Sequence, residues 1–476
     1  MAKESKNQLL SLIRLGREMT LRQQLHLMAL LSTPAIMAHI SSTLMQYIDA
    51  AMVGHLGARA TASIGLVEST IWLFAGICSA VATGFYVQVA HHIGANRFIE
   101  ARNVLRQSLV AVLAFSFCVL LGGVIISESL PFWLGGSEDI APYSSAYFRI
   151  FALCIPFLQL EMLAGGMLRC SGNLLVPSML NILMCILDVI FNFFLIYPTR
   201  ICELGDVHLW IPGAGLGVIG AALGTAGAEI VVAALMLYFL CVRSNEMKIV
   251  DEAGRRFMPT RKCVLKAIKI GVPMGIQCMV TSTAQIVTTL IIAPLGTVAL
   301  AAHSLGISVE SLCYMPGYGI SEAATTLVGQ SMGARRPSLM KRFAYISVAM
   351  GMSVMTVMGI IMYVFAPLMM GILTPDLEVQ HLGAMCLRIE AMAEPMFAIA
   401  IVCYGCFVGA GDTLVPSGMN FVSMWAVRLT IAAILAPTYG LKGVWIAMCV
   451  ELCFRGAIFL ARMRWGHWAK TLPAET

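Results

Sequence analysis

The chain has 476 residues, of which 59% are hydrophobic and 12% are charged, and its mean hydropathy is +0.84. A soluble protein cannot bury that much apolar surface, so the composition excludes a soluble fold and predicts an integral membrane protein. The net charge of +6 comes from basic residues that gather on one side of the predicted helices, which indicates membrane orientation rather than a nucleic-acid partner.

Twelve apolar runs are long enough to cross about 30 Å of hydrocarbon. In chain order the predicted spans are 26–52, 62–90, 103–126, 143–168, 175–197, 214–242, 264–292, 298–329, 343–370, 382–409, 416–436 and 441–462. The first apolar run is too long for a cleavable signal peptide. Cys403 and Cys406 form a CxxC pair in the middle of a predicted helix, without a second pair, so a zinc or redox site is not expected.

The loops between these spans alternate in charge. One side holds the N-terminus and most of the basic residues, among them Arg97, Arg102, Arg106, Arg169, Arg243, Lys248, Arg255, Arg256, Lys262, Lys266, Lys269, Arg335, Arg336, Arg464 and Lys470. The other side holds only Arg59, Arg200 and Lys442. The positive-inside rule therefore predicts a multi-pass membrane protein with both termini in the cytoplasm. We expect its location to be the bacterial inner (plasma) membrane.

The two halves of the chain repeat each other at an offset of 239 residues. Pro34 corresponds to Pro273, and the segment GNLLVP at 172–177 corresponds to GDTLVP at 411–416. The last helices match at an offset of 223, which predicts a shorter final outer loop. We expect an all-α membrane protein with twelve transmembrane helices in two pseudo-symmetric, parallel six-helix bundles. The predicted division is 1–242 for the N-terminal bundle, 243–262 for a cytoplasmic linker and 263–476 for the C-terminal bundle.

These motifs resemble the multidrug and toxic compound extrusion (MATE) family over nearly the whole chain. The segments that carry the resemblance are YIDAAMVGHLG (47–57), the pair VAHHIGANR and VGQSMGARR (89–97 and 328–336), the GNLLVP and GDTLVP pair, and GVIGAALGT (217–225). The resemblance implies secondary active export of amphipathic or cationic compounds, driven by inward H⁺ or Na⁺, with alternating access. It also implies that Asp49 is the central cation-coupling residue of the N-terminal bundle and that Pro34 is the bending point of the first helix.

A carboxylate in the middle of a membrane helix costs about 2.5–3.5 kcal/mol on insertion scales, so each one is expected to face a bundle interior and to have a function. Asp49 lies about 22 Å along the first helix from Pro34, at 1.5 Å per residue. The alternative interpretation is an aspartate at the end of the helix, because Gly54 follows closely.

Asp188 and Asn192 lie four residues apart, so their side chains share one face of the fifth helix. Thr225 on the sixth helix could add a hydroxyl. With Asp49 these groups offer the oxygens that a Na⁺ site requires, and two neighbouring carboxylates in a poorly solvated pocket could instead take up a proton. The alternative is a helix–helix hydrogen-bonding role. The chain resembles the DinF-like branch of the family more closely, although that branch has the asparagine first and the aspartate four residues later, so the order here is reversed. The seventh helix lacks the carboxylate that the NorM-like branch is expected to have, which favours ion coupling in the N-terminal bundle.

Glu390 and Glu394 are also four residues apart, on the tenth helix, and correspond to Phe151 and Ile155 in the first half. They are second candidates for cation or substrate contact, and the alternative is that Arg388 pairs with one of them. Glu68 and Glu229 are further candidates for substrate or a second cation. Glu161, Glu310 and Glu322 are expected to line the cleft or cap helices, Arg428 and Glu451 to form a structural ion pair, and His39 and His303 to be packed or hydrogen-bonded.

No nucleophile–base pair or metal-ligand spacing points to an enzyme, and no cofactor is expected besides the coupling ion. The expected partners are small amphipathic or cationic substrates and membrane lipid, with a monomer as the oligomeric state. Two alternatives are a lipid-linked precursor flippase of the same superfamily and a membrane scaffold. The acidic character of the N-terminal bundle argues against the anionic load of a flippase, and the lack of a soluble output domain argues against the scaffold.

Overall fold

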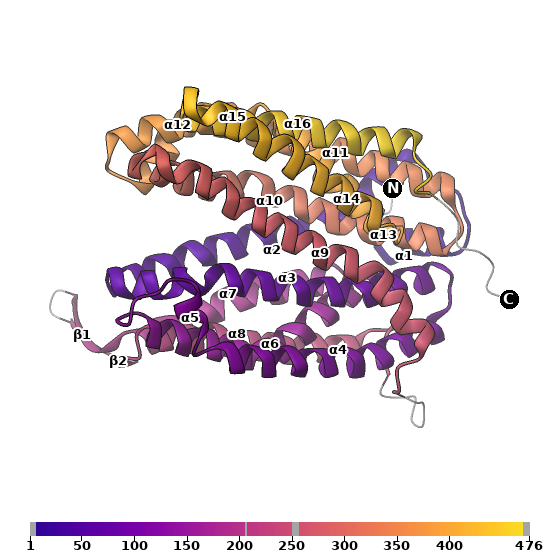
Figure 1. The fold of residues 1–476 in the computed structure, drawn as a ribbon. Helices are drawn as coiled ribbons and strands as arrows, with labels where there is room; N and C mark the ends of the chain where they lie inside the picture. Colours follow the sequence, from indigo (N-terminus) through magenta and orange to yellow (C-terminus); the bar gives the residue numbers. More distant parts are fainter. Residues whose placement is uncertain (1–5, 205–206, 250–256, 470–476) are drawn as a thin grey trace.

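The computed structural model describes residues 6–204, 207–249 and 257–469, and nearly all of these residues lie in long helices (Figure 1). The helices of the first half are α1 (Lys6–Arg14), α2 (Leu21–Gly54), α3 (Ala58–Gly94), α4 (Phe98–Ile126), α5 (Leu130–Trp133), α6 (Ala141–Cys170), α7 (Leu175–Ile196) and α8 (Val218–Tyr238), which continues into the π-helix η1 (Phe239–Arg243). The first membrane helix, α2, begins with a capping box, in which Thr20 accepts a hydrogen bond from the Gln23 amide and the Gln23 side chain accepts one from the Thr20 amide.

The second half repeats this order. Its helices are α9 (Arg261–Ile292), the 3₁₀ turn η2 (Ala293–Leu295), α10 (Thr297–Gly333), α11 (Pro337–Leu373), α12 (Leu377–Ala391), α13 (Glu394–Gly409), α14 (Leu414–Val422), the π-helix η3 (Ser423–Leu429), α15 (Thr430–Tyr439) and α16 (Leu441–Trp465). Within the described residues, eleven helices are long and apolar enough to cross a membrane, or twelve when the bent pair α12–α13 counts as one span. The predicted fold class is confirmed.

The tenth predicted span, 382–409, is not one continuous helix. It is divided into α12 and α13, whose axes differ by 59°. The break falls at Met392 and Ala393, directly before the first turn of α13, where Pro395 stands. A proline is tolerated in a first turn but not inside a helix, because it has no N–H group to donate. The break sets Glu390 at the end of one helix and Glu394 at the start of the next.

Two short elements depart from the sequence prediction. Residues 198–214, predicted as an outer loop, form an antiparallel hairpin of β1 (Pro198–Leu204) and β2 (Val207–Ala214), with an irregularity between Pro198 and Arg200. The corresponding connection of the second half is only the turn around Gly440, which explains the shorter offset of the last helices. The polar N-terminal segment contains the amphipathic helix α1, which buries Leu9, Leu10 and Ile13.

The two halves meet through their first two long helices. Helix α2 packs along α10, and α3 packs along α9, so each half presents the same pair of helices to the other. The two groups of helices lie closest at the end that carries both termini and diverge toward the end that carries the β-hairpin (Figure 1). We refer to these as the termini end and the hairpin end.

Glycines allow the closest approach at the termini end. A Cβ atom on Gly94 would lie 2.0 Å from the carbonyl oxygen of Gln330, and one on Gly333 would lie 1.9 Å from that of His91. These two contacts are related by the internal repeat. Because each partner atom belongs to the backbone, a side chain at either glycine would force the halves apart.

We predict that Gly333→Ala destabilises the protein by about 1–3 kcal/mol, the usual cost of overpacking, because the new methyl group meets the His91 carbonyl. Thermal unfolding of the purified protein would measure the change. Gly122→Ala is the matched control, since its Cβ meets nothing within 4 Å. Equal melting temperatures for the two variants would contradict the close backbone contact.

Candidate functional site

The predicted coupling residues converge inside the first half. Asn192 on α7 donates one hydrogen bond of 3.0 Å to Asp49 on α2 and another of 3.1 Å to Asp188, one helical turn earlier on α7. Asp188 and Asn192 are fully buried. Asp49 therefore faces the bundle interior, and the alternative of an aspartate at the helix end is wrong, because α2 continues to Gly54.

Several oxygens at this site lack a partner. The Oδ1 atoms of Asp188 and Asn192 are buried without a hydrogen bond in the described part of the chain. Thr225 on α8 lies close enough to interact with Asp188 through its hydroxyl. Buried polar atoms are normally satisfied, so unpaired oxygens on two neighbouring side chains favour an occupant that supplies positive charge or a proton.

Gly224 sets the position of Asn192. A Cβ atom on Gly224 would lie 2.1 Å from the Asn192 Oδ1 atom and 3.0 Å from its backbone nitrogen. A side chain there would displace the amide that bridges the two carboxylates. The glycine next to Thr225 thus has a role that the sequence analysis did not assign.

A cavity of about 250 Å³ reaches this site from the hairpin end and is lined by Asp49, Asn192 and Thr225 together with Glu68 and Tyr147. Glu68 is exposed and accepts a 3.5 Å hydrogen bond from Trp72. It therefore stands at the side of the cavity and not among the buried oxygens.

The donor set fits a small hard cation or a proton better than a transition metal. No cluster of three His, Cys, Asp or Glu side chains with metal-binding geometry occurs in the described ranges. Two carboxylates, one amide oxygen and one hydroxyl are the ligand types of an alkali or alkaline-earth cation. Asp49, Asp188, Asn192 and Thr225 are the residues that would hold it.

Glu229 lies one turn along α8 from Thr225, deeper in the first half. It is buried, its Oε1 atom has no hydrogen-bond partner among the described residues, and it interacts electrostatically with Asp188 and Glu161. Glu229 thus extends the acidic interior of the first half beyond the Asp49 cavity.

Glu390 and Glu394 form the corresponding acidic group of the second half. Their exposed fractions are 0% and 1%, and all four carboxylate oxygens lack a hydrogen-bond partner within the described chain. Glu310 on α10, also buried, interacts with both of them. Unpaired buried carboxylates are costly to retain, so these residues remain candidates for cation or substrate contact.

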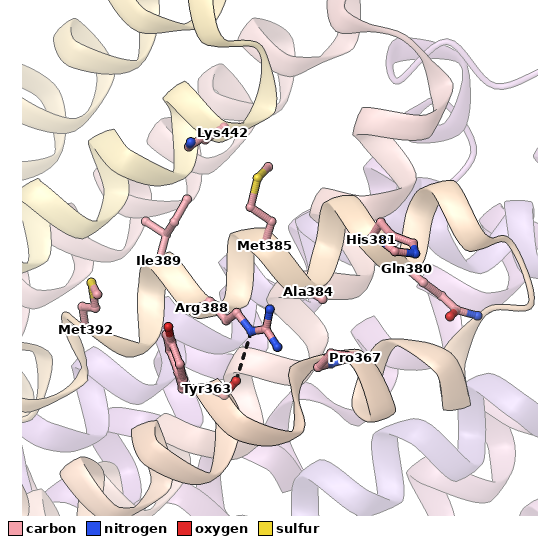
Figure 2. A pocket seen from close by; sticks show the side chains of 10 residues that line it. All are labelled: Tyr363, Pro367, Gln380, His381, Ala384, Met385, Arg388, Ile389, Met392 and Lys442. Atoms are coloured by element: carbon pink, nitrogen blue, oxygen red, sulfur yellow. Dashed lines mark hydrogen bonds between the residues drawn. The ribbon is translucent and has the colours of Figure 1, made fainter.

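The alternative that Arg388 pairs with Glu390 or Glu394 is wrong. Arg388 donates a 3.3 Å hydrogen bond to the Tyr363 carbonyl and lies over the Tyr363 ring. Figure 2 shows it in a cavity of about 580 Å³ between α11, α12 and Lys442 of α16. Residues two apart on a helix point to opposite sides, so Arg388 faces away from the buried Glu390.

Arg428 and Glu451 form the predicted ion pair, with an N–O distance of 2.8 Å. Arg455 also binds the Glu451 carboxylate at 2.7 Å, and Ser423 donates a hydrogen bond to it. Arg428 lies in the π-helix η3, where the widened backbone helps to direct its side chain toward α16. The sequence analysis found the pair but missed Arg455, which carries no signal beyond its i, i+4 spacing from Glu451.

A cavity of about 330 Å³ lies between the two halves. Its walls contain the aromatic side chains of Tyr86, Tyr318, Phe397 and Tyr404. Glu322 of α10 lies in the same cavity. The combination of aromatic rings and a carboxylate suits an amphipathic cation, since a cation is attracted to the face of an aromatic ring.

Glu322 also joins the two halves. Its carboxylate lies 3.5 Å from the His39 Nε2 atom of α2 and 3.7 Å from the guanidinium of Arg169 of α6. Arg169, assigned above to a loop, lies in the last turn of α6 and is largely buried. Glu161 lines an adjoining cavity of about 220 Å³ with Arg169 and Glu322. His303 is packed edge-on against Trp445, as expected for a packing role.

Comparison with known proteins gives a consistent family assignment. The MatE family model matches residues 34–194 and again 273–434, so one model covers both halves of the internal repeat. The chain is 25% identical to a Thermotoga maritima protein named "Probable multidrug resistance protein NorM", over 92% of both chains. It is 26% identical to a protein of the same name from Xanthomonas axonopodis pv. citri, over 91% of this chain and 93% of that one.

Solved structures show the same fold. A MATE family transporter described as multidrug-resistant and outward-facing superposes with a TM-score of 0.86 at 18% identity, covering 97% of this chain and 98% of that chain. A MATE protein crystallised with MaD3S also gives 0.86, at 18% identity and 96% coverage of this chain. The expected DinF-like branch stays a prediction, since these comparisons do not separate the branches.

We predict opposite effects on stability for two buried glutamates of the second half. Glu451→Gln leaves two guanidinium groups without their counter-charge and should cost about 3–5 kcal/mol. Glu390→Gln removes a charge that accepts no hydrogen bond from a described residue and that lies near Glu310 and Glu394; Arg428 attracts it electrostatically but is already bound to Glu451, so the change should be neutral or stabilising. Thermal unfolding of the purified variants compares them, and a greater loss for Glu390→Gln would refute the distinction.

Proposed function

This chain belongs to the MatE family of transporters, and on that premise we propose that it is a multidrug efflux transporter that exports amphipathic or cationic compounds by cation-coupled antiport. The curated relatives named as multidrug resistance proteins support the class of activity. The observation that carries the coupling step is the convergence of Asp49, Asp188 and Asn192 around oxygens that lack partners.

The first half would hold the coupling ion. H⁺ or Na⁺ in the cavity would offset the mutual repulsion of Asp49 and Asp188, the two carboxylates that Asn192 bridges. Helix α2 carries Asp49 and also contacts the second half, so a change at Asp49 can reach the interface directly. Pro34, which lies inside α2 and donates no backbone hydrogen bond, is the proposed bending point.

The central cavity would hold the substrate. Its aromatic walls accept apolar and cationic groups of varied shape, and Glu322 supplies a counter-charge. In the conformation described here Glu322 is engaged by His39 and Arg169. Because these partners belong to the first half and Glu322 belongs to the second, separation of the halves at the termini end would free the carboxylate for a cationic substrate.

We place the termini end in the cytoplasm. The excess of Lys and Arg at this end supports that orientation. The glycine contacts at Gly94 and Gly333 then close the protein toward the cytoplasm. Glu390, Glu394 and Glu310 would form a second acidic site for cation or substrate, within the second half.

We predict that Asp49→Asn abolishes cation-driven export while the protein still folds, because the amide keeps the shape but has no negative charge to attract a cation and does not take up a proton. Gly224→Ala should weaken export without removing any charge, by displacing Asn192. Efflux of a fluorescent cation from proteoliposomes measures both. Asp139→Asn is the control, since this exposed side chain lies outside the cavities. Full export by Asp49→Asn would exclude the coupling role.

The coupling ion is tested by imposing one gradient at a time. Proteoliposomes with a proton gradient and no sodium, and others with a sodium gradient at equal pH, are loaded with the same fluorescent cation. We predict stimulation by one of the two gradients and its loss in Asp188→Asn. A lack of response to both gradients would argue against antiport and favour the flippase or scaffold.

A further inference from the structure

The internal repeat produces two equivalent contact regions between the halves at the termini end, which we call seams. Different side chains occupy the two seams. In one seam Gln330 donates a 2.9 Å hydrogen bond to the Cys170 carbonyl, and in the other His91 makes the equivalent 2.8 Å contact with the Gly409 carbonyl. His91 and Gln330 are 239 residues apart, as are Cys170 and Gly409. The two seams therefore have the same backbone frame.

The N-terminal helix α1 fills the first seam. A Cβ atom on Gly172 would lie 2.4 Å from the Leu10 side chain, and Arg14 donates a hydrogen bond to the Ser171 carbonyl. Arg336 of the second half donates a 3.1 Å hydrogen bond to the Leu12 carbonyl. The buried leucines of α1 pack against Leu27, Leu31 and Leu327 of both halves. Helix α1 of the chain itself thus occupies this seam.

The second seam holds a cavity of about 470 Å³ with a basic lining. Lys262, Lys266 and Lys269 stand at i, i+4 and i+7 on one face of α9. The opposite walls carry His91, His92, Arg97 and Arg335. At the positions equivalent to the three lysines the first half has Gln23, Leu27 and Leu30. The repeat thus keeps the same backbone arrangement and has three lysines where the first half has a glutamine and two leucines.

Arg335 adds an independent observation. Its φ is +55°, in the left-handed region, and its repeat partner Asn96 has φ +62°. Asparagine tolerates this conformation well, whereas a long side chain such as arginine is strained there. The second half therefore retains a strained arginine where the first half has the easier residue, and this arginine lines the cavity.

An exposed apolar stripe of α9 runs alongside the lysines. Leu265, Ile268 and Val272 have exposed fractions of 51%, 49% and 50%. At 100° per residue these three side chains form a stripe next to the stripe of Lys262, Lys266 and Lys269. A molecule with an acyl chain on the apolar stripe would carry its head group into the basic cavity.

We propose that this second seam is a binding site for the phosphate head group of an anionic phospholipid. Basic cavities between membrane helices on the cytoplasmic side are suited to anionic head groups. The lysines come from the second half, and His91, His92 and Arg97 come from the first. The lipid therefore bridges the halves at the end where they are closed, as α1 does in the other seam, and it stabilises this closed arrangement.

The test is native mass spectrometry of the full-length protein titrated with dioleoyl phosphatidylglycerol or dioleoyl phosphatidylcholine. We expect one phosphatidylglycerol to be retained in preference to phosphatidylcholine. Each basic residue contributes roughly fivefold to the binding of an anionic lipid. The triple variant Lys262→Gln, Lys266→Gln, Lys269→Gln should therefore bind phosphatidylglycerol at least about tenfold more weakly. Lys341→Gln with Arg342→Gln, two exposed basic residues at the start of α11, should bind like the unchanged protein.

Arg335→Asn separates binding from folding. The asparagine relieves the backbone strain, so the lipid-free protein should melt at the same or a higher temperature, while phosphatidylglycerol binding falls about fivefold. Undiminished phosphatidylglycerol binding by both the triple variant and Arg335→Asn would overturn the site. Displacement of the lipid by an equal concentration of inorganic phosphate would contradict a lipid ligand and would show that the site binds a free anion.

Discussion

Hydrocarbon cannot solvate a charge, and this constraint sorts the buried acids of the protein into two groups. Glu451 is bound by two arginines, and Glu322 is engaged by Arg169 and His39. These paired acids hold helices together. Glu390 and Glu394 are as deeply buried, yet none of their oxygens has a partner among the described residues. Packing does not explain why such groups persist, so Glu390 and Glu394 are candidates for contact with a transported ligand.

The duplicated fold supports two different sites. Asp49, Asp188 and Asn192 correspond to Thr288, Val427 and Ile431 in the second half, while Glu390 and Glu394 correspond to Phe151 and Ile155 in the first. Each half has therefore kept the helices and lost the other's acids. The same divergence separates the two seams at the termini end. The internal repeat determines where the helices contact one another, and the individual side chains at each contact determine which ligands can bind there.

Sequence reasoning predicted the parts that follow from periodicity and from the cost of buried charge. The spans, the repeat and the Arg428–Glu451 pair follow from apolar runs, the offset of 239 and depth in the membrane. Helix α1 was missed because nine residues with three buried apolar side chains are too short to stand out. The break before Glu394 was not predicted, because the sequence does not show whether Pro395 begins a helix or interrupts one. The role of Arg169 was not predicted because it arises from tertiary contacts with α10.

Helix α2 is the element through which the first half can act on the second. Two residues before Asp49, Tyr47 donates a hydrogen bond to the Ser308 carbonyl of α10. Further along, His39 faces Glu322, and Ile36 lies against Gly319, where a Cβ atom would be 2.6 Å from the Ile36 nitrogen. Pro34 interrupts the backbone hydrogen bonds at the level of that contact. The ion site at Asp49, the contact of Tyr47 with α10, the His39–Glu322 pair and Pro34 thus follow one another along α2. A bend at Pro34 would move all of them together, because a packed interface shifts between discrete arrangements and does not deform continuously.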